Sequence, residues 1–128
     1  MSPEDHLKQL LERYPSLSEC SDDIQALYEA IADSFKRGGK LLVAGNGGSA
    51  ADADHIVGEI VKGFGLKREL PESVKAQLKD ADPERGTDLA EHLQGSLPAI
   101  ALTAQSGIIT AVLNDIGGNY VFAQQVMG

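Results

Sequence analysis

The feature of the sequence that most constrains the fold is a short apolar run that ends in glycines and leads into a helix. Leu41 to Ala44 are apolar, and the turn at 45–48 contains three glycines. An apolar run of this length between turn residues is typical of a strand buried on both faces in a parallel sheet. Glycine permits positive φ and lets a ligand approach the backbone. The stretch therefore predicts a strand, a glycine-rich turn and a helix that Ser49 caps.

The turn predicts a site for a phosphate or a sugar hydroxyl. Unpaired N–H groups at a helix start point at the ligand, and the helix dipole favours negative charge. The turn is not a P-loop, because the Gly-Lys-Ser/Thr ending is absent. A dinucleotide site is a weaker alternative, since Ala50 stands at the third glycine position and no acidic residue follows a second strand at the usual distance.

The helix predicted at about 50–63 carries His55 and Glu59, which are four residues apart and therefore neighbours on its surface. These two residues lie roughly opposite an apolar stripe, with polar residues nearby. Such a pair suits the binding of one metal ion or one substrate. The spacing alone favours a second interpretation, a solvated polar face that happens to carry a His–Glu pair. The stripe consists of Ala53, Ile56, Val57, Ile60, Val61 and Phe64.

Other elements follow from periodicity and turn residues. Two helices are predicted before the strand, at about 4–14 and from Ser21 to about residue 35. The segment 66–95 is rich in charge and contains two short predicted helices, at 71–78 and 87–93, the second capped by Thr87. A segment of this length between a helix and a strand is usually functional or flexible. A lid, an oligomer contact and a plain surface elaboration are the three alternatives for it.

The last part of the chain predicts a second buried strand at 98–103 and a helix at 106–113. Asn114 and Asp115 are placed in a polar turn, where both residue types are common. A final helix is predicted at about 119–127.

The composition excludes several classes of partner. Lys and Arg number 11 and Asp and Glu 19, which gives a net charge of −8. An acidic chain of this kind does not favour nucleic acid or an anionic membrane. No apolar run approaches the 18 or so residues that a membrane span needs. Cys20 is the single cysteine, so an internal disulfide is excluded, which suits the cytoplasm.

Several motifs of this chain, separated and in the same order, resemble the signature of phosphoheptose isomerases in the sugar isomerase (SIS) family. The resemblance covers about residues 20–65 and 97–127, including the helix and turn at 33–40 that lead into the strand. The motif residues are Gly45, Asn46, Gly47, Gly48, Ser49, Asp52, His55, Glu59, Asn114 and Asp115.

The resemblance implies an α/β fold with a SIS-type doubly wound parallel sheet flanked by helices. The family continues with a third strand, a Ser/Thr-rich phosphate loop, and a Gln and a His that complete a metal site, and none of these occurs before Gly128. We therefore expect residues 1–128 to be a single, truncated SIS domain with two strands, N-terminal helices at 1–38 and an insertion at 66–95. A truncated chain, a fragment and a short protein completed by association are the alternatives.

The resemblance also implies a function, the interconversion of an aldose and a ketose form of sedoheptulose 7-phosphate through an enediol. It assigns proton transfer to Glu59 and metal binding to His55 and Glu59. Zinc suits these ligands, but two are fewer than the three or four of an ordinary zinc site. The substrate contacts that it implies are Asn46, Gly47, Gly48, Ser49, Asn114 and Asp115.

The alternative function is a non-catalytic SIS module that binds a sugar phosphate or a protein partner for regulation. A relative in the same family is a protein-binding factor in replication initiation, which supports this alternative. The expected partners are a phosphosugar substrate and further copies of the chain, in a homodimer or homotetramer built through the N-terminal helices and the helix at about 50–63. Neither nucleic acid nor a membrane is expected.

Overall fold

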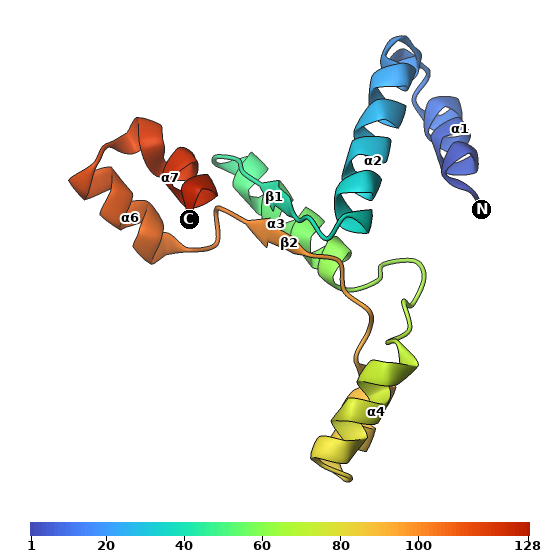
Figure 1. The fold of residues 1–128 in the computed structure, drawn as a ribbon. Coiled ribbons are helices and arrows are strands. Elements are labelled where there is room, and N and C mark those ends of the chain that lie inside the picture. The colour runs from blue at the N-terminus through green and yellow to red at the C-terminus, as the bar shows by residue number, and fades with distance from the viewer. The chain divides into compact units, whose positions relative to one another are not determined.

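The computed structural model describes residues 1–128, which form two compact units, Met1–Gly39 and Lys40–Gly128. The first unit consists of α1 (Pro3–Arg13), a 3-10 helix (Pro15–Cys20) and α2 (Ser21–Lys36), as Figure 1 shows. Ser2 caps α1 in a capping box, because its hydroxyl accepts from the Asp5 N–H and the Asp5 carboxylate accepts from the Ser2 N–H. Both helices predicted before the strand are confirmed.

The second unit contains a parallel pair of strands, β1 (Leu41–Val43) and β2 (Ala99–Ala101), in the register Leu41 to Ala99 and Val43 to Ala101. Between them the chain forms α3 (Gly48–Val61), α4 (Glu72–Ala81) and α5 (Arg85–His92). Parallel strands require such a crossover connection. The predicted α/β class with two parallel strands is confirmed.

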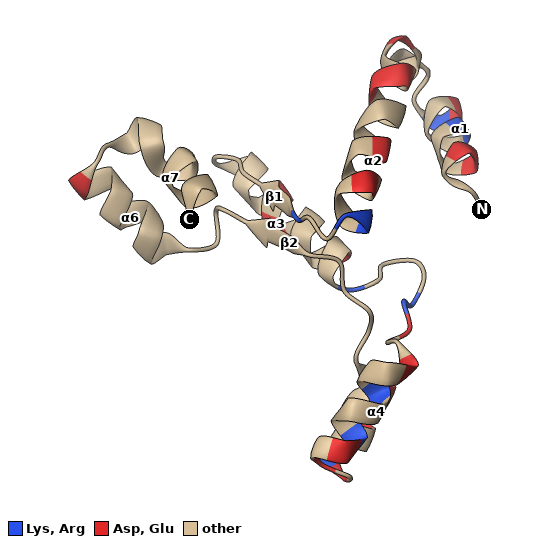
Figure 2. Cartoon of the chain, in the orientation of Figure 1, with Lys and Arg blue, Asp and Glu red and all other residues tan.

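The chain ends with α6 (Ser106–Asp115), a 3-10 helix (Gly118–Tyr120) and α7 (Val121–Met127). Gln125 attaches α7 to the carboxyl end of β2, since its Nε2 donates to the Leu102 carbonyl at 3.0 Å. Asp115 is the single charged residue between 106 and 127, so α6 and α7 are almost without charge (Figure 2). These two helices therefore present apolar surface beside the sheet.

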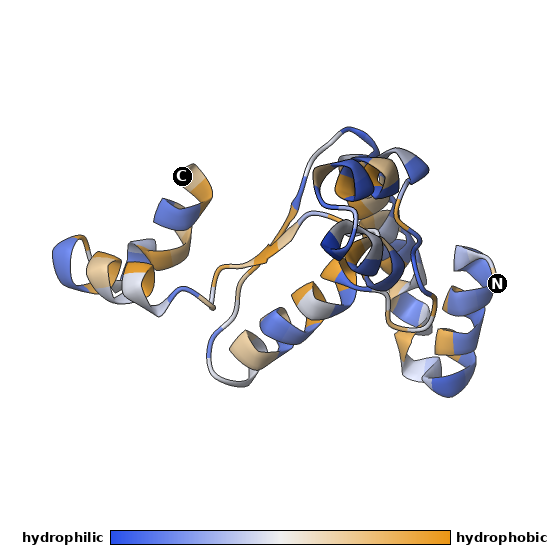
Figure 3. Ribbon diagram, turned by 90° about the horizontal axis from the view of Figure 1, so that it is seen from below, coloured by the Kyte–Doolittle hydropathy of each residue, from blue (hydrophilic) through white to orange (hydrophobic).

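The buried core of the second unit is small. The two strands and one side of the helices around them carry most of the hydrophobic residues (Figure 3). Phe64 was predicted in the apolar stripe of α3, but it follows the end of the helix and is 86% exposed. The prediction failed there because α3 ends at Val61, before the stripe reaches Phe64. The buried apolar residues are Ala53, Ala90, Ala101, Leu102, Val112 and Val121.

The insertion is a folded helical hairpin with a closed neck. The Arg68 guanidinium donates to the carbonyls of Ile60 and Gly95, and the Gly95 N–H donates back to the Arg68 carbonyl at 2.7 Å. The Gly63 N–H donates to the Gln94 side chain at 2.9 Å. This neck lies at the carboxyl end of α3 and before β2, so the hairpin leaves the sheet at the end opposite the glycine turn.

The helix boundaries in the insertion differ from the prediction. The second helix begins at Arg85, so Thr87 lies inside it and does not cap it. The Thr87 hydroxyl donates to the Pro83 carbonyl at 2.7 Å, one turn earlier. Asp82 supplies the acceptor for the helix start, because its carboxylate accepts from the N–H groups of Glu84 and Arg85. None of the helices in the structure combines the length and the apolar character that crossing a bilayer requires.

Candidate functional site

The glycine turn after β1 has a backbone that only glycine accommodates. Gly47 has φ of 58° and ψ of −123°, a conformation that side chains disfavour. A Cβ on Gly45 would overlap the Ser49 backbone, so the turn also depends on a close approach there. The prediction that Ser49 caps the helix is wrong, because α3 begins at Gly48 and Gly47 is the residue before it.

The turn leaves backbone donors unpaired. The Ser49 N–H donates to the Asn46 carbonyl at 3.1 Å, whereas the N–H groups of Gly47 and Gly48 have no acceptor in the chain. Two backbone N–H groups that can bind an anion or a hydroxyl are thus available at the start of α3.

A cavity of about 370 Å³ lies beside this turn, at the carboxyl ends of the two strands. Of the predicted substrate contacts, Asn46 and Gly47 line it. Thr103, the second residue after the end of β2, also lines the cavity, and sequence reasoning did not single it out. Its position just past a buried strand was the signal that could have identified it, since ligands of α/β proteins bind at the carboxyl ends of strands. The remaining wall consists of Gly45, Ala50, Ile109, Leu113, Gly118, Val121 and Phe122.

His55 and Glu59 lie on α3, one turn apart, and do not line the cavity. The His55 Nε2 lies 4.0 Å from the Glu59 Oε1, and the Lys62 Nζ lies 3.8 Å from the same oxygen. At about 1.5 Å of rise per residue, His55 is about 10 Å and Glu59 about 16 Å along the helix from Gly48. A ligand that reaches from the glycine turn to the His55–Glu59 pair would therefore contact the two with different parts of its structure.

Glu59 is more buried than its place opposite the apolar stripe suggests. Its side chain is 28% exposed, whereas that of His55 is 78% exposed. The Glu59 Oε2 is buried and has no hydrogen-bond partner. A buried carboxylate oxygen without a partner is costly, so a ligand, an ion or a water molecule that pairs with the Glu59 Oε2 would stabilise it.

The donor set does not by itself fit a zinc site. A zinc ion needs at least three protein ligands, and no group of three His, Cys, Asp or Glu side chains in residues 1–128 is arranged to hold a metal. His55 and Glu59 supply two donors. The zinc expectation stays a prediction.

Asn114 and Asp115 lie in the last turn of α6 and not in a polar turn after it, which corrects the predicted end of that helix. The prediction failed because α6 continues two residues past its last apolar position. The Asn114 amide donates to the Asp115 carboxylate at 2.7 Å, and both residues are exposed. They follow Leu113, which lines the cavity, but do not line it themselves.

Comparison with known proteins identifies the family. Residues 5–122 match the SIS domain family, so the chain belongs to the SIS family. Phosphoheptose isomerase of Roseiflexus sp. (strain RS-1) is 42% identical over 103 residues, which cover 80% of this chain and 39% of that protein. Phosphoheptose isomerase of Synechocystis sp. (strain ATCC 27184 / PCC 6803 / Kazusa) is 37% identical over 120 residues, which cover 90% of this chain and 48% of the relative.

The fold has a matching solved structure. Phosphoheptose isomerase GmhA from Neisseria gonorrhoeae superimposes with a TM-score of 0.53 at 29% sequence identity, over 95% of this chain and 46% of that one. The chain thus spans less than half the length of the relatives that it matches.

Proposed function

We propose that this chain forms part of a phosphosugar isomerase that interconverts an aldose and a ketose form of sedoheptulose 7-phosphate. The observation that carries the proposal is the glycine turn with two unpaired N–H donors, followed on the same helix by His55 and Glu59. The similarity to proteins named phosphoheptose isomerase supports the substrate class. Since the chain spans less than half of those proteins, the activity is proposed for the whole protein that contains it.

In this proposal Glu59 is the base. Aldose–ketose interconversion moves a proton between adjacent carbons through an enediol, so a carboxylate must take the proton from one carbon and return it to the other. A partly buried carboxylate suits this task, because it has no competing hydrogen-bond donor at Oε2. His55 lies one turn earlier and binds the substrate or a metal ion beside Glu59.

Substrate contacts are proposed at the glycine turn and at the end of α6. The N–H groups of Gly47 and Gly48, together with the Asn46 amide, offer donors for hydroxyl or phosphate oxygens. Ser49 presents its hydroxyl in the first turn of α3. Asn114 and Asp115 end α6 next to the cavity wall and offer further contacts to sugar hydroxyls.

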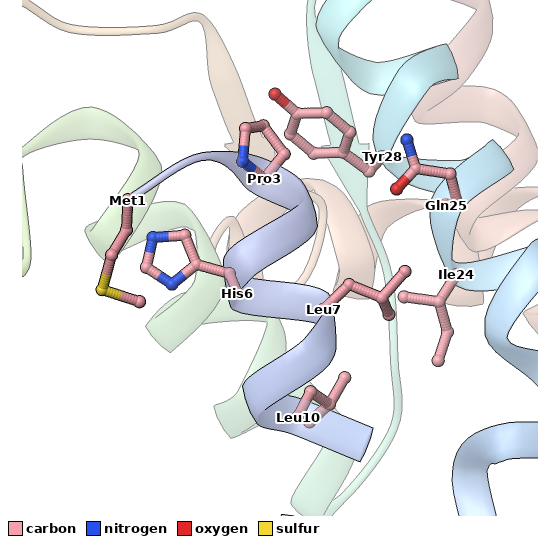
Figure 4. A pocket seen from close by; sticks show the side chains of 8 residues that line it. All are labelled: Met1, Pro3, His6, Leu7, Leu10, Ile24, Gln25 and Tyr28. Carbon is pink, nitrogen blue, oxygen red and sulfur yellow. The ribbon is translucent and has the colours of Figure 1, made fainter. Parts of the chain in front are cut away.

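We propose in addition that the protein is a homo-oligomer assembled through α1 and α2 and that it acts in the cytoplasm. An apolar groove between these helices supports this, with Leu7, Leu10 and Ile24 on its walls and Tyr28 at its edge (Figure 4). Leu27 beside it is 62% exposed. Burial of such side chains is the usual driving force for association.

A non-catalytic module that binds a sugar phosphate or a protein partner is the second candidate. It is favoured by one observation, the absence of His55 and Glu59 from the cavity lining. Turnover of sedoheptulose 7-phosphate, measured beside its binding by calorimetry, separates the two. Binding with turnover supports the isomerase, and binding without turnover supports the module. No binding contradicts the isomerase and leaves only a module that binds a protein partner.

A further inference from the structure

The cavity beside the glycine turn has very few polar side chains. Of its ten lining residues, only Asn46 and Thr103 carry a side-chain group that forms hydrogen bonds. The others are glycine, alanine or larger apolar residues, which shape a ligand site but do not orient a polar ligand. Thr103 is therefore one of two side chains that decide how a polar ligand lies in this cavity.

The Thr103 hydroxyl is already engaged as a donor. Its Oγ1 donates to the Asp54 Oδ1 at 3.0 Å, which joins the carboxyl end of β2 to α3. A hydroxyl has one proton to donate and two lone pairs that accept, and a carboxylate accepts only. Because its proton is directed at Asp54, the Thr103 hydroxyl can only accept a hydrogen bond from a ligand.

The two sides of the cavity thus differ in polarity. On the side of the glycine turn, Gly47 lines the cavity and its N–H has no acceptor, whereas on the other side Thr103 presents an acceptor. The dianionic phosphate group of a phosphate ester has only acceptor oxygens, so it gains nothing from an acceptor and is repelled by the carboxylate behind it. A sugar hydroxyl donates to an acceptor readily.

We propose that Thr103, held by Asp54, binds a hydroxyl of the sugar and thereby selects a polyhydroxylated phosphate ester over phosphate alone. This inference rests on the proposed phosphosugar function. Thr103 contacts the substrate directly, and Asp54 is a positioning residue that fixes the direction of the Thr103 hydroxyl.

Thr103→Val tests the contact, since valine keeps the shape and removes the hydroxyl. Calorimetry on the whole protein measures the affinities for sedoheptulose 7-phosphate and for methyl phosphate, a phosphate ester whose dianion has only acceptor oxygens. Loss of one hydrogen bond to the sugar weakens the phosphosugar complex about three- to tenfold and leaves methyl phosphate binding unchanged. Thr103→Ser retains the hydroxyl and stays within about twofold of the parent.

Thr110→Val is the matched control. The Thr110 hydroxyl donates to the Ser106 carbonyl at 2.8 Å within α6, and the residue does not line the cavity. Its replacement leaves both affinities unchanged. Melting temperatures of all variants report whether each of them folds.

Asp54→Ala and Asp54→Asn test the positioning role. Both remove the charge, but only alanine removes the acceptor of the Thr103 proton. Alanine therefore frees the hydroxyl to donate to an anion, so the ratio of phosphosugar to methyl phosphate affinity falls further than in the asparagine variant. A purely structural role would lower both affinities and the melting temperature together.

The outcomes separate this inference from the proposed function. A parent protein that binds sedoheptulose 7-phosphate, with a Thr103→Val variant that binds it equally well, overturns the inference and leaves the function standing. Equal loss of phosphosugar and methyl phosphate binding in Thr103→Val overturns it as well. A parent that does not bind the phosphosugar overturns the proposed function and the inference with it. If Thr103→Val does not fold, the ratio in the two Asp54 variants decides.

Discussion

At the residue scale, the Glu59 carboxylate combines a neighbour on its own helix, His55, with a second oxygen that is buried and unpaired. The four-residue spacing from His55 places the two side chains together on α3, and their atoms are 4.0 Å apart in the structure. The burial of the Glu59 Oε2 was not predictable, because it depends on the segments that pack against the helix and not on the helix period. Thr103 was missed for a related reason, since its partner Asp54 lies 49 positions away in the sequence.

Gly86 provides a stability test at the same scale. A Cβ at this position would overlap the Leu78 carbonyl, where α4 and α5 pack closely. Gly86→Ala should therefore lower the free energy of unfolding by about 1–3 kcal/mol, as overpacking does. Urea denaturation measures the change.

Gly107→Ala is the matched control for that substitution. Gly107 is likewise the second residue of its helix, and a Cβ there meets nothing within 4 Å. Alanine should leave the stability unchanged or raise it by up to about 1 kcal/mol. Equal effects of the two substitutions would contradict the close approach of α4 and α5.

At the element scale, the periodicity of the chain predicted the helices and strands, but their ends depended on local hydrogen bonds. The start of α5 follows from the Asp82 carboxylate, and the closed neck of the insertion follows from Arg68. The Arg68 contact has no sequence signature, because its acceptors are backbone carbonyls, whereas Asp82 followed by Pro83 is a helix-start signal that the assignment to Thr87 overlooked. A lid, an oligomer contact and a plain surface elaboration stay the three predicted alternatives for the insertion.

Arg68→Ala should open the neck of the hairpin. It removes two charge-assisted hydrogen bonds, to the carbonyls of Ile60 and Gly95, and should cost about 1–3 kcal/mol. Hydrogen exchange should become faster in α4 and α5. Arg85→Ala is the control, since only the backbone N–H of Arg85 is hydrogen-bonded, and exchange there should not change. Unaltered exchange in the Arg68 variant would show that the neck does not hold the hairpin.

The pair Glu72 and Lys75 gives α4 a pH dependence. A hydrogen bond from Lys75, and then its charge, lowers the pKa of the Glu72 carboxyl below its ordinary value of 4.5. A carboxyl with a lowered pKa in the folded state stabilises the helix above pH 4.5, and this is lost as the pH falls through the lowered pKa. The hydrogen bond to Glu72 raises the pKa of Lys75 above 10.5, so its contribution is present below that pH and is lost as the pH rises through the raised value.

An NMR titration of the Glu72 carboxyl checks this prediction. The pKa of Glu72 should lie below 4.5 in the parent and should rise toward 4.5 in Lys75→Met. An identical pKa in both proteins would mean that the ion pair is not formed in solution.

At the scale of the whole molecule, the sequence predicted an α/β chain with two parallel strands because apolar runs, glycine turns and helical periods are local signals. The extent of burial was not predictable in this way. The buried core consists mainly of small residues, and large apolar side chains such as Leu66, which is 83% exposed, remain at the surface. Association of several copies would cover part of this exposed surface.

Leu27→Glu tests the proposed association. Leu27 lies on α2 beside the apolar groove, and a charge there should prevent its burial between copies. Light scattering should show a dimer or tetramer for the parent and a smaller species for the variant. Ala26→Glu adds the same charge on the polar side of α2, near Asp33, and should leave the mass unchanged. A parent that is monomeric at high concentration would contradict the assembly.

The proposed reaction is tested most directly by the exchange of the substrate's C–H proton with solvent deuterium, compared between the whole parent protein and its Glu59→Gln variant. Glutamine keeps the shape of the side chain but does not accept the proton, so exchange should slow by about 10²–10⁴-fold. The fold should be retained, with a change in the free energy of unfolding below about 1 kcal/mol. Exchange as fast in the Gln variant as in the parent would show that Glu59 is not the base, and no exchange in the parent would contradict the isomerase itself.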